Sequence, residues 1–151
     1  FIGDGALKPK LIRRVEVENI KNCKFIDPMP KDELFTYLQK EANVGLMILD
    51  NIPAFYFGTS PNKFFDYIAL GLPVLNNYPG WIAEMITDNN CGLAIEPRNP
   101  EAFCEALITL KRDRKSLTQM GQNAKQLAVS KFDRNKLSDQ FVDFLETSIN
   151  K

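Results

Sequence analysis

Short apolar runs alternate with amphipathic segments along residues 1–97, and few folds accommodate such an alternation. The predicted strands are Phe1–Gly3, Cys23–Ile26, Val44–Leu49, Pro73–Asn76 and Gly92–Ile95. The predicted helices between them are Pro9–Glu18, Lys31–Glu41, Asn62–Leu70 and Trp81–Thr87. Strands that alternate with helices pair in parallel through right-handed crossovers. We therefore expect an α/β fold built on a Rossmann-like, doubly wound parallel sheet.

The run Val44–Leu49 is apolar without alternation, which predicts a central strand covered on both faces. After Pro97 the pattern is helical throughout, and Asn99-Pro100-Glu101 is typical of a helix start with an N-cap, a proline and an acidic residue. Three apolar stripes at helical spacing follow. Their members are Phe103, Ala106, Leu107 and Leu110; Leu117, Met120, Ala124, Leu127 and Ala128; and Leu137, Phe141, Phe144 and Leu145. The sheet is thus expected to be followed by C-terminal helices.

The chain has 151 residues, which predicts a single domain over residues 1–151. Because it opens inside a predicted strand, we expect it to be a fragment of a longer polypeptide. The 19 basic and 19 acidic residues balance, which argues against a nucleic-acid partner. Three widely spaced cysteines favour a reducing, cytoplasmic compartment, and the absence of histidine excludes histidine-based acid–base and zinc chemistry. The apolar runs are too short to span a bilayer.

The best candidate site lies in the loop that leads into the predicted helix Asn62–Leu70. Amide groups at the helix start, together with the hydroxyls of Thr59 and Ser60, would bind an anion, and Lys63 adds a charge suited to phosphate. Asp66 follows almost one turn later, where its carboxylate could accept hydrogen bonds from a ribose diol. The alternative is purely structural: Ser60 or Thr59 caps the helix, Lys63 is solvated and Asp66 offsets the helix dipole.

Three further features are less specific. Gly3-Asp4-Gly5 forms a strand-to-helix turn, but it lacks the third glycine of the dinucleotide fingerprint and is better explained as a tight turn. The loop Asp27–Pro30 follows a predicted strand and could present backbone groups to a base, or be a plain turn. Trp81 could stack on a ligand or pack in the core.

The segment Ser60–Val74, SPNKFFDYIALGLPV, resembles the carboxy-terminal domain of GT-B glycosyltransferases of family 4. The flanking segments Phe1–Gly5, Cys23–Ile26 and Asn90–Ile95 agree in order with the same domain. The resemblance implies the C-terminal half of a GT-B fold, which binds the nucleotide sugar, and an acceptor-binding N-terminal domain outside this chain. It also implies that the first strand and helix of the domain are missing, that the isolated chain is inactive, and that it self-associates.

The resemblance implies roles for particular residues. Asp66 stands where relatives bind the ribose hydroxyls, and Asn62 and Lys63 stand where they contact the diphosphate or the donor sugar. Thr59 and Ser60 lie in the loop that faces the transferred sugar. The remaining positions are Ile26, Asp27 and Met29 beside the base, and Gly58, where many relatives carry a second glutamate.

The implied activity is retaining transfer of a hexosyl or N-acetyl amino sugar from a UDP-sugar to a glycan or lipid-linked acceptor, in bacterial surface-polysaccharide synthesis. No metal site and no cofactor besides the nucleotide-sugar substrate are expected, and the full-length protein is expected in the cytoplasm or peripherally at the inner membrane. Three alternatives stay open: a non-catalytic nucleotide-binding or regulatory module, a sugar-nucleotide epimerase on the same architecture, and an unrelated doubly wound domain of the flavodoxin or response-regulator kind.

Overall fold

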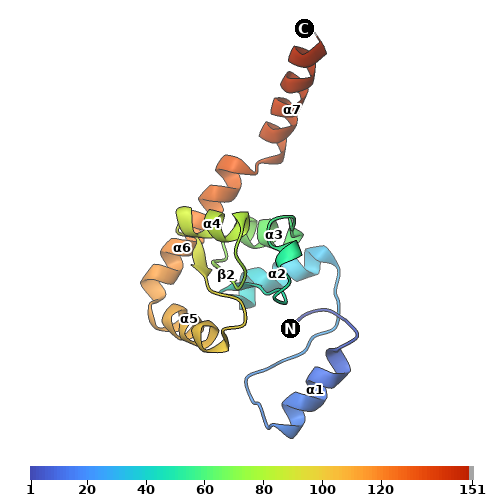
Figure 1. Cartoon of the computed structure of the whole chain (residues 1–151), viewed down its shortest axis with the longest axis vertical. Helices are drawn as coiled ribbons and strands as arrows, with labels where there is room; N and C mark the ends of the chain where they lie inside the picture. The colour runs from blue at the N-terminus through green and yellow to red at the C-terminus, as the bar shows by residue number, and fades with distance from the viewer. Residues whose placement is uncertain (150–151) are drawn as a thin grey trace. The chain divides into compact units, whose positions relative to one another are not determined.

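The structure is a computed structural model that describes residues 1–149. It divides into two compact units, with unit 1 formed by residues 1–41 and unit 2 by the residues from Ala42 onward. Figure 1 labels α1 to α7 and β2, and each unit is considered by itself.

Unit 1 contains α1 (Lys8–Val17) and α2 (Lys31–Glu41). Ile2 and Ile26 form an isolated parallel bridge, in which Ile26 N donates to Phe1 O at 2.8 Å and Gly3 N donates to Ile26 O at 3.1 Å. The parallel direction predicted for the segments Phe1–Gly3 and Cys23–Ile26 is confirmed, but the two full strands are not formed. One bridge between two short segments supplies too few ladder hydrogen bonds to define a strand.

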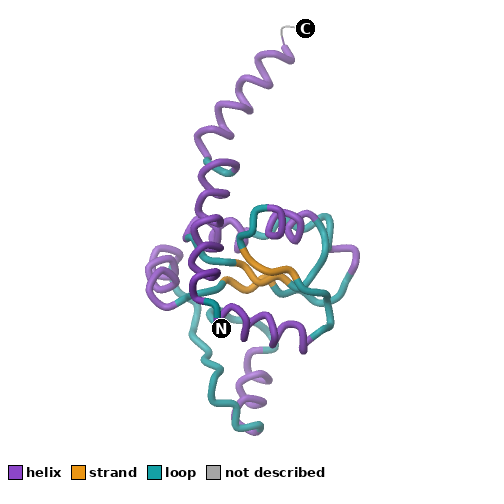
Figure 2. The backbone as a smooth tube through the Cα atoms, turned by 90° about the vertical axis from the view of Figure 1, so that its left-hand side faces the viewer, coloured by secondary structure: helices purple, strands orange, loops and turns teal. Residues whose placement is uncertain are grey.

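Unit 2 is built on a parallel sheet of β1 (Gly45–Met47), β2 (Val74–Asn76) and β3 (Gly92–Ala94), in the order β1-β2-β3. Figure 2 shows these strands side by side in orange. Leu75, in the middle of β2, pairs with Leu46 on one side and Leu93 on the other. The prediction of a parallel α/β sheet is confirmed.

The prediction that Val44–Leu49 forms a central strand is wrong. Of the three strands, β2 is the one whose residues are all buried, whereas β1 lies at an edge of this sheet with Leu46 only partly covered. Ile48, just after β1, is 45% exposed. An unbroken apolar run shows that a strand can be covered on both faces, but the position in the sheet depends on which strands pair with it.

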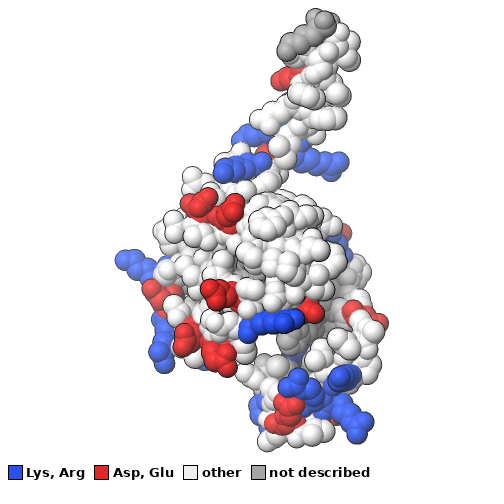
Figure 3. Space-filling view, viewed as in Figure 1, with Lys and Arg blue, Asp and Glu red and all other residues white. Residues whose placement is uncertain are grey.

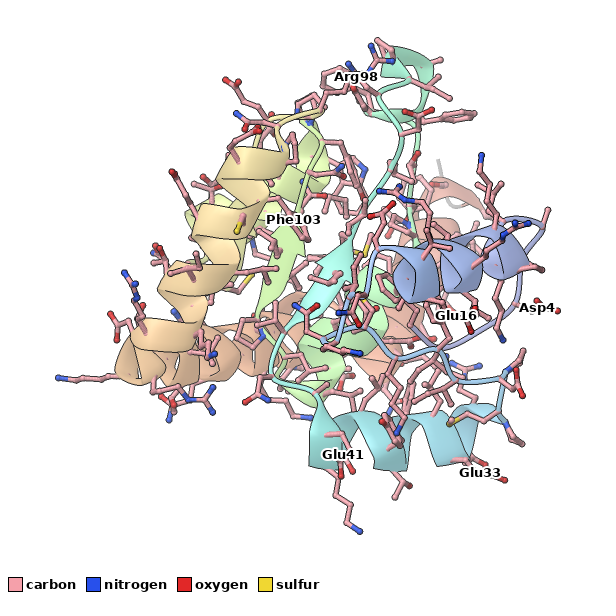
Figure 4. All side chains as sticks on the ribbon, turned by 90° about the horizontal axis from the view of Figure 1, so that it is seen from below. Asp4, Glu16, Glu33, Glu41, Arg98 and Phe103 are labelled. Carbon is pink, nitrogen blue, oxygen red and sulfur yellow. The ribbon has the colours of Figure 1, made fainter. Side chains whose placement is uncertain are left out.

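The helices of unit 2 follow the predicted order. They are α3 (Asn62–Leu70), α4 (Trp81–Asp88), α5 (Pro100–Arg112), α6 (Arg114–Lys131) and α7 (Arg134–Ile149), with a short 3-10 helix, η1 (Pro53–Phe55), before α3. The predicted start of α5 is confirmed, because the side chain of Asn99 accepts a hydrogen bond from Ala102 N at 2.9 Å. Figures 1 and 2 both show α3 and α4 on one side of the sheet, while Figure 4 shows Phe103 of α5 pointing toward the strands.

The core of unit 2 lies between the sheet and its helices. Phe64 and Ile68 of α3, together with Ile82 and Ile86 of α4, have no exposed surface. Helix α6 packs against α3 and β3 and contributes Ala124, Leu127 and other small or branched side chains. Because α3 and α4 are buried in this way, their starts are held rigidly at the end of the sheet.

Helix α7 has no buried residue, so its apolar stripe is exposed. Phe141 is 62% exposed, Phe144 is 66% exposed and Leu145 is 43% exposed. Figure 1 shows α7 continuing beyond the end of α6.

Candidate functional site

The carboxyl ends of β1 and β2 lie next to each other, and the loops that leave them are joined by one asparagine. Leu49 N donates to Asn77 Oδ1 at 2.8 Å, and Asn77 Nδ2 donates back to Leu49 O at 3.0 Å. Open parallel sheets bind their ligands at this edge. The two loops lead to α3 and α4, so the starts of these helices are the first place to look for a site.

No side chain accepts a hydrogen bond from the backbone N–H groups at the start of helix α3. Its N-cap is Pro61, with φ −80° and ψ 128°, and no side chain caps it. The alternative that Thr59 or Ser60 caps this helix is therefore wrong. Within residues 1–149, the backbone N–H groups of Asn62 and Lys63 have no acceptor. These two donors, at the positive end of the helix dipole, are suited to an anion.

Helix α4 begins in the same way. Its N-cap is Gly80, at φ 112°, without a side-chain hydrogen bond. A Cβ atom at this position would lie 2.4 Å from Tyr56 O, so a glycine is required both by the backbone conformation and by the close approach of the preceding loop.

Trp81 links the two helix starts. Its indole Nε1 donates to Thr59 O at 3.0 Å, and its ring lies 6.3 Å from the ring of Phe64 and 6.4 Å from that of Phe65, measured between centroids. Trp81 is thus a packing residue, which decides the question left open by its sequence position. Trp81 consequently connects the start of α4 to the start of α3 and to the loop before it.

The loop before α3 contains three of the predicted site residues. The hydroxyl of Thr59 donates to Phe55 O, so its proton is engaged inside the loop. Ser60 and Gly58 are exposed, and a Cβ atom at Gly58 would meet nothing within 4 Å. The structure places all three beside the start of α3, as predicted.

Lys63 and Asp66 lie on α3, three residues apart. Lys63 is exposed and Asp66 is half-buried. Burial, and to a smaller extent the charge of Asp66, raises the pKa of the neighbouring Tyr67 hydroxyl. A cation and a carboxylate therefore lie within the first two turns of the helix whose start carries the free amides.

The predicted residues Ile26, Asp27 and Met29 belong to unit 1. Asp27 accepts a hydrogen bond from Lys8 Nζ at 2.7 Å, and the same ammonium group donates to Gly3 O at 2.9 Å. This hydrogen bond and the charge of Lys8 lower the pKa of Asp27. The pair connects the loop after Ile2 to the loop after Ile26, so both predicted turns of unit 1 are fixed by one lysine.

Asp27 and Lys8 line a shallow groove of unit 1 together with acidic residues of both the first loop and α1. Figure 4 labels two of them, Asp4 and Glu16. Basic and acidic side chains are interspersed on the face drawn in Figure 3.

Across residues 1–149, no three cysteine, aspartate or glutamate side chains form a cluster that could hold a metal ion. None of the helices in this range is long and apolar enough to cross a bilayer.

Comparison with known proteins decides the family. Residues 1–127 match the family described as glycosyl transferases group 1. The chain belongs to this family. The match ends inside α6, so α7 lies outside the matched range.

Two similar proteins are considerably longer than this chain. It is 27% identical over 109 residues to a D-inositol 3-phosphate glycosyltransferase of Corynebacterium glutamicum (strain R), covering 69% of this chain and 23% of the relative. Its fold is similar to that of a sucrose-phosphate synthase from Thermosynechococcus elongatus, with a TM-score of 0.76 at 18% identity, over 97% of this chain and 35% of the synthase. The similarity confirms the predicted GT-B type of fold. The group 1 glycosyltransferase chain thus spans about a quarter to a third of the length of these proteins.

One part of the site was missed from the sequence. A helix from Trp81 was predicted and Trp81 was considered as a ligand contact, but the start of this helix was not recognised as a neighbour of the start of α3. Its contribution depends on the contact between Trp81 and Thr59, which are 22 residues apart, and no local pattern predicts that contact.

Proposed function

We propose that this glycosyltransferase chain binds the donor of the reaction, a UDP-sugar, at the paired starts of α3 and α4. The observation that carries the proposal is the convergence of two uncapped helix starts at the carboxyl edge of a parallel sheet. A diphosphate brings two negative charges, and two helix dipoles with free N–H groups stabilise them better than one. Lys63 adds a full positive charge at the same end of α3.

In the same proposal, Asp66 binds the ribose. A carboxylate accepts hydrogen bonds from both hydroxyls of a diol, and hydrogen bonds to a charged group are stronger than neutral ones. Asp66 lies one turn from the amides of Asn62 and Lys63, which matches the short separation between ribose and diphosphate in a nucleotide. Ser60, Thr59 and Gly58 are then proposed to face the sugar.

The proposed reaction transfers a hexosyl or N-acetyl amino sugar with retention to a glycan or lipid-linked acceptor. The bond between the anomeric carbon and the diphosphate oxygen breaks, and UDP leaves with the electron pair. An acceptor hydroxyl oxygen forms the new bond to the anomeric carbon, and its proton passes to the departing diphosphate. The positive helix ends and Lys63 stabilise the charge that develops on UDP. The acceptor is proposed to bind to a domain outside this chain. The proposed setting is bacterial surface-polysaccharide synthesis in the cytoplasm, peripherally at the inner membrane.

Calorimetric titration with UDP, GDP and ADP tests the donor site. We expect UDP to bind most tightly, and Asp66→Ala to weaken its binding by about 1–3 kcal/mol because charged hydrogen bonds to the ribose are lost. Asp88→Ala is the matched control, since Asp88 is an exposed residue at the opposite end of α4. Equal losses in the two variants, or no binding of any nucleotide, would contradict the proposal.

Self-association through α7 is also proposed, because its exposed phenylalanines form an apolar surface. We expect sedimentation velocity to show a concentration-dependent dimer, and Phe144→Glu to remove it. A chain that stays monomeric at high concentration would refute this part.

A further inference from the structure

The loop between β1 and α3 exposes aromatic side chains that the proposed diphosphate and ribose contacts do not use. Phe55 is 55% exposed and Phe57 is 71% exposed, although the residue between them, Tyr56, is buried. Large aromatic groups are costly to leave in water and mark contact surfaces when a rigid scaffold presents them.

The loop is rigid because it is held from inside. The ring of Tyr56 stacks on that of Tyr78, with centroids 6.4 Å apart, and Tyr56 N donates to Pro53 O at 3.1 Å. The Thr59 hydroxyl binds Phe55 O, and Thr59 O accepts the Trp81 indole. The direction in which Phe57 projects is therefore set by the fold.

Phe57 lies beside the converging helix starts. Its ring atom Cδ1 is 3.6 Å from the position of a Cβ atom on Gly80, the N-cap of α4. Three residues separate Phe57 from Pro61, the N-cap of α3. Figure 3 shows that much of the surface over α3 and this loop carries no charged side chain.

We infer that Phe57 is a specificity-determining contact for the sugar of the donor, with its ring covering one apolar face of the pyranose. The inference rests on the proposed function, because the sugar is bonded to the diphosphate that the helix starts would hold. That bond confines the sugar to the immediate surroundings of α3 and α4, where Phe57 is the large exposed side chain whose ring contacts the α4 start. An aromatic face binds the C–H groups of a pyranose while the hydroxyls at the ring edge stay solvated.

The test compares the nucleotide with and without its sugar. Calorimetry gives the dissociation constants of UDP, UDP-glucose and UDP-N-acetylglucosamine for the unchanged chain, Phe57→Ala and Phe57→Tyr. Ile108→Ala is the control, because Ile108 is an exposed apolar residue on α5, outside the proposed site. We expect Phe57→Ala to weaken at least one of the UDP-sugars by about three- to tenfold, while UDP changes by less than about twofold, as for loss of one aromatic contact. Phe57→Tyr keeps the ring and should retain the affinity.

A second readout identifies the contact itself. Saturation-transfer NMR should show transfer to the sugar ring protons of UDP-N-acetylglucosamine, and Phe57→Ala should reduce it while transfer to the uracil protons persists. If UDP binds and Phe57→Ala leaves every UDP-sugar unaffected, or weakens UDP equally, the inference is overturned and the proposed donor site stands. If UDP itself does not bind, both are overturned.

Discussion

Gly121 lies in the middle of α6, where this helix passes closest to the turn that ends α3. A Cβ atom on Gly121 would lie 2.6 Å from the backbone oxygen of Gly71 and 3.6 Å from Cδ of Pro73. Gly71 itself has φ 72° and ends α3, so its carbonyl group is held by the turn. Gly121→Ala therefore tests whether α6 is packed against α3 as tightly as the structure shows.

Two effects of opposite sign decide the result. Alanine is favoured over glycine inside a helix by about 1 kcal/mol. Against this, carbon and oxygen atoms are most stable at roughly 3.5 Å, so the added methyl group overlaps the main chain and α6 must move. Overpacking costs about 1–3 kcal/mol, and the upper value applies because the obstacle is backbone and the buried Ala124 and Leu127 move with the helix. The expected net destabilisation is about 2 kcal/mol.

The assay is urea unfolding followed by the fluorescence of Trp81, the single tryptophan of the sequence. With an m-value of about 1–3 kcal/mol/M, the midpoint should fall by roughly 1 M, and the melting temperature by about 4–8 °C. Gln126→Ala is the control, since Gln126 is exposed on the same helix and should change stability by less than about 0.5 kcal/mol. If Gly121→Ala instead raises the midpoint, helix propensity dominates and the close approach of α6 to Gly71 is refuted.

Three other outcomes are expected. The hydroxyl of Tyr78 is buried without a hydrogen-bond partner in residues 1–149, so Tyr78→Phe should raise the free energy of unfolding by about 1 kcal/mol, and a loss of stability would show that the hydroxyl is bonded. Burial raises the pKa of the Cys91 thiol to about 11, so a thiol reagent at pH 8 should modify the exposed Cys104 and leave Cys91 unreacted until the chain unfolds; equal reactivity would contradict this. An NMR titration should find the pKa of Asp27 below its usual value, and Lys8→Gln should restore it. Because the pKa of Asp27 is depressed in the folded state, the stability that the ion pair contributes is present at higher pH and is lost as the pH falls through this pKa. An unchanged pKa in the variant would exclude the pair.

Much of the local structure could be predicted from the sequence. Helices α2 and α3 have the predicted bounds, and α5 begins at the predicted asparagine cap. These features depend on residues within a few positions of each other: caps, prolines and the spacing of apolar side chains. The segment that carries the donor-site prediction, residues 58–66, is equally local, so its residues are together in the structure.

What the sequence did not decide is which distant elements meet. The apolar run around β1 predicts a strand with two covered faces, yet β2 holds the central place in the sheet, because neighbours and not composition determine that place. The convergence of α3 and α4 follows from the pairing of β1 with β2, the Asn77 bridge and the contact of Trp81 with Thr59. By itself the sequence determined the parallel α/β class, the helices and the residues at the start of α3. Only the tertiary structure placed a second helix start beside the first and Phe57 against Gly80, because these contacts join segments that are separated along the chain by whole elements.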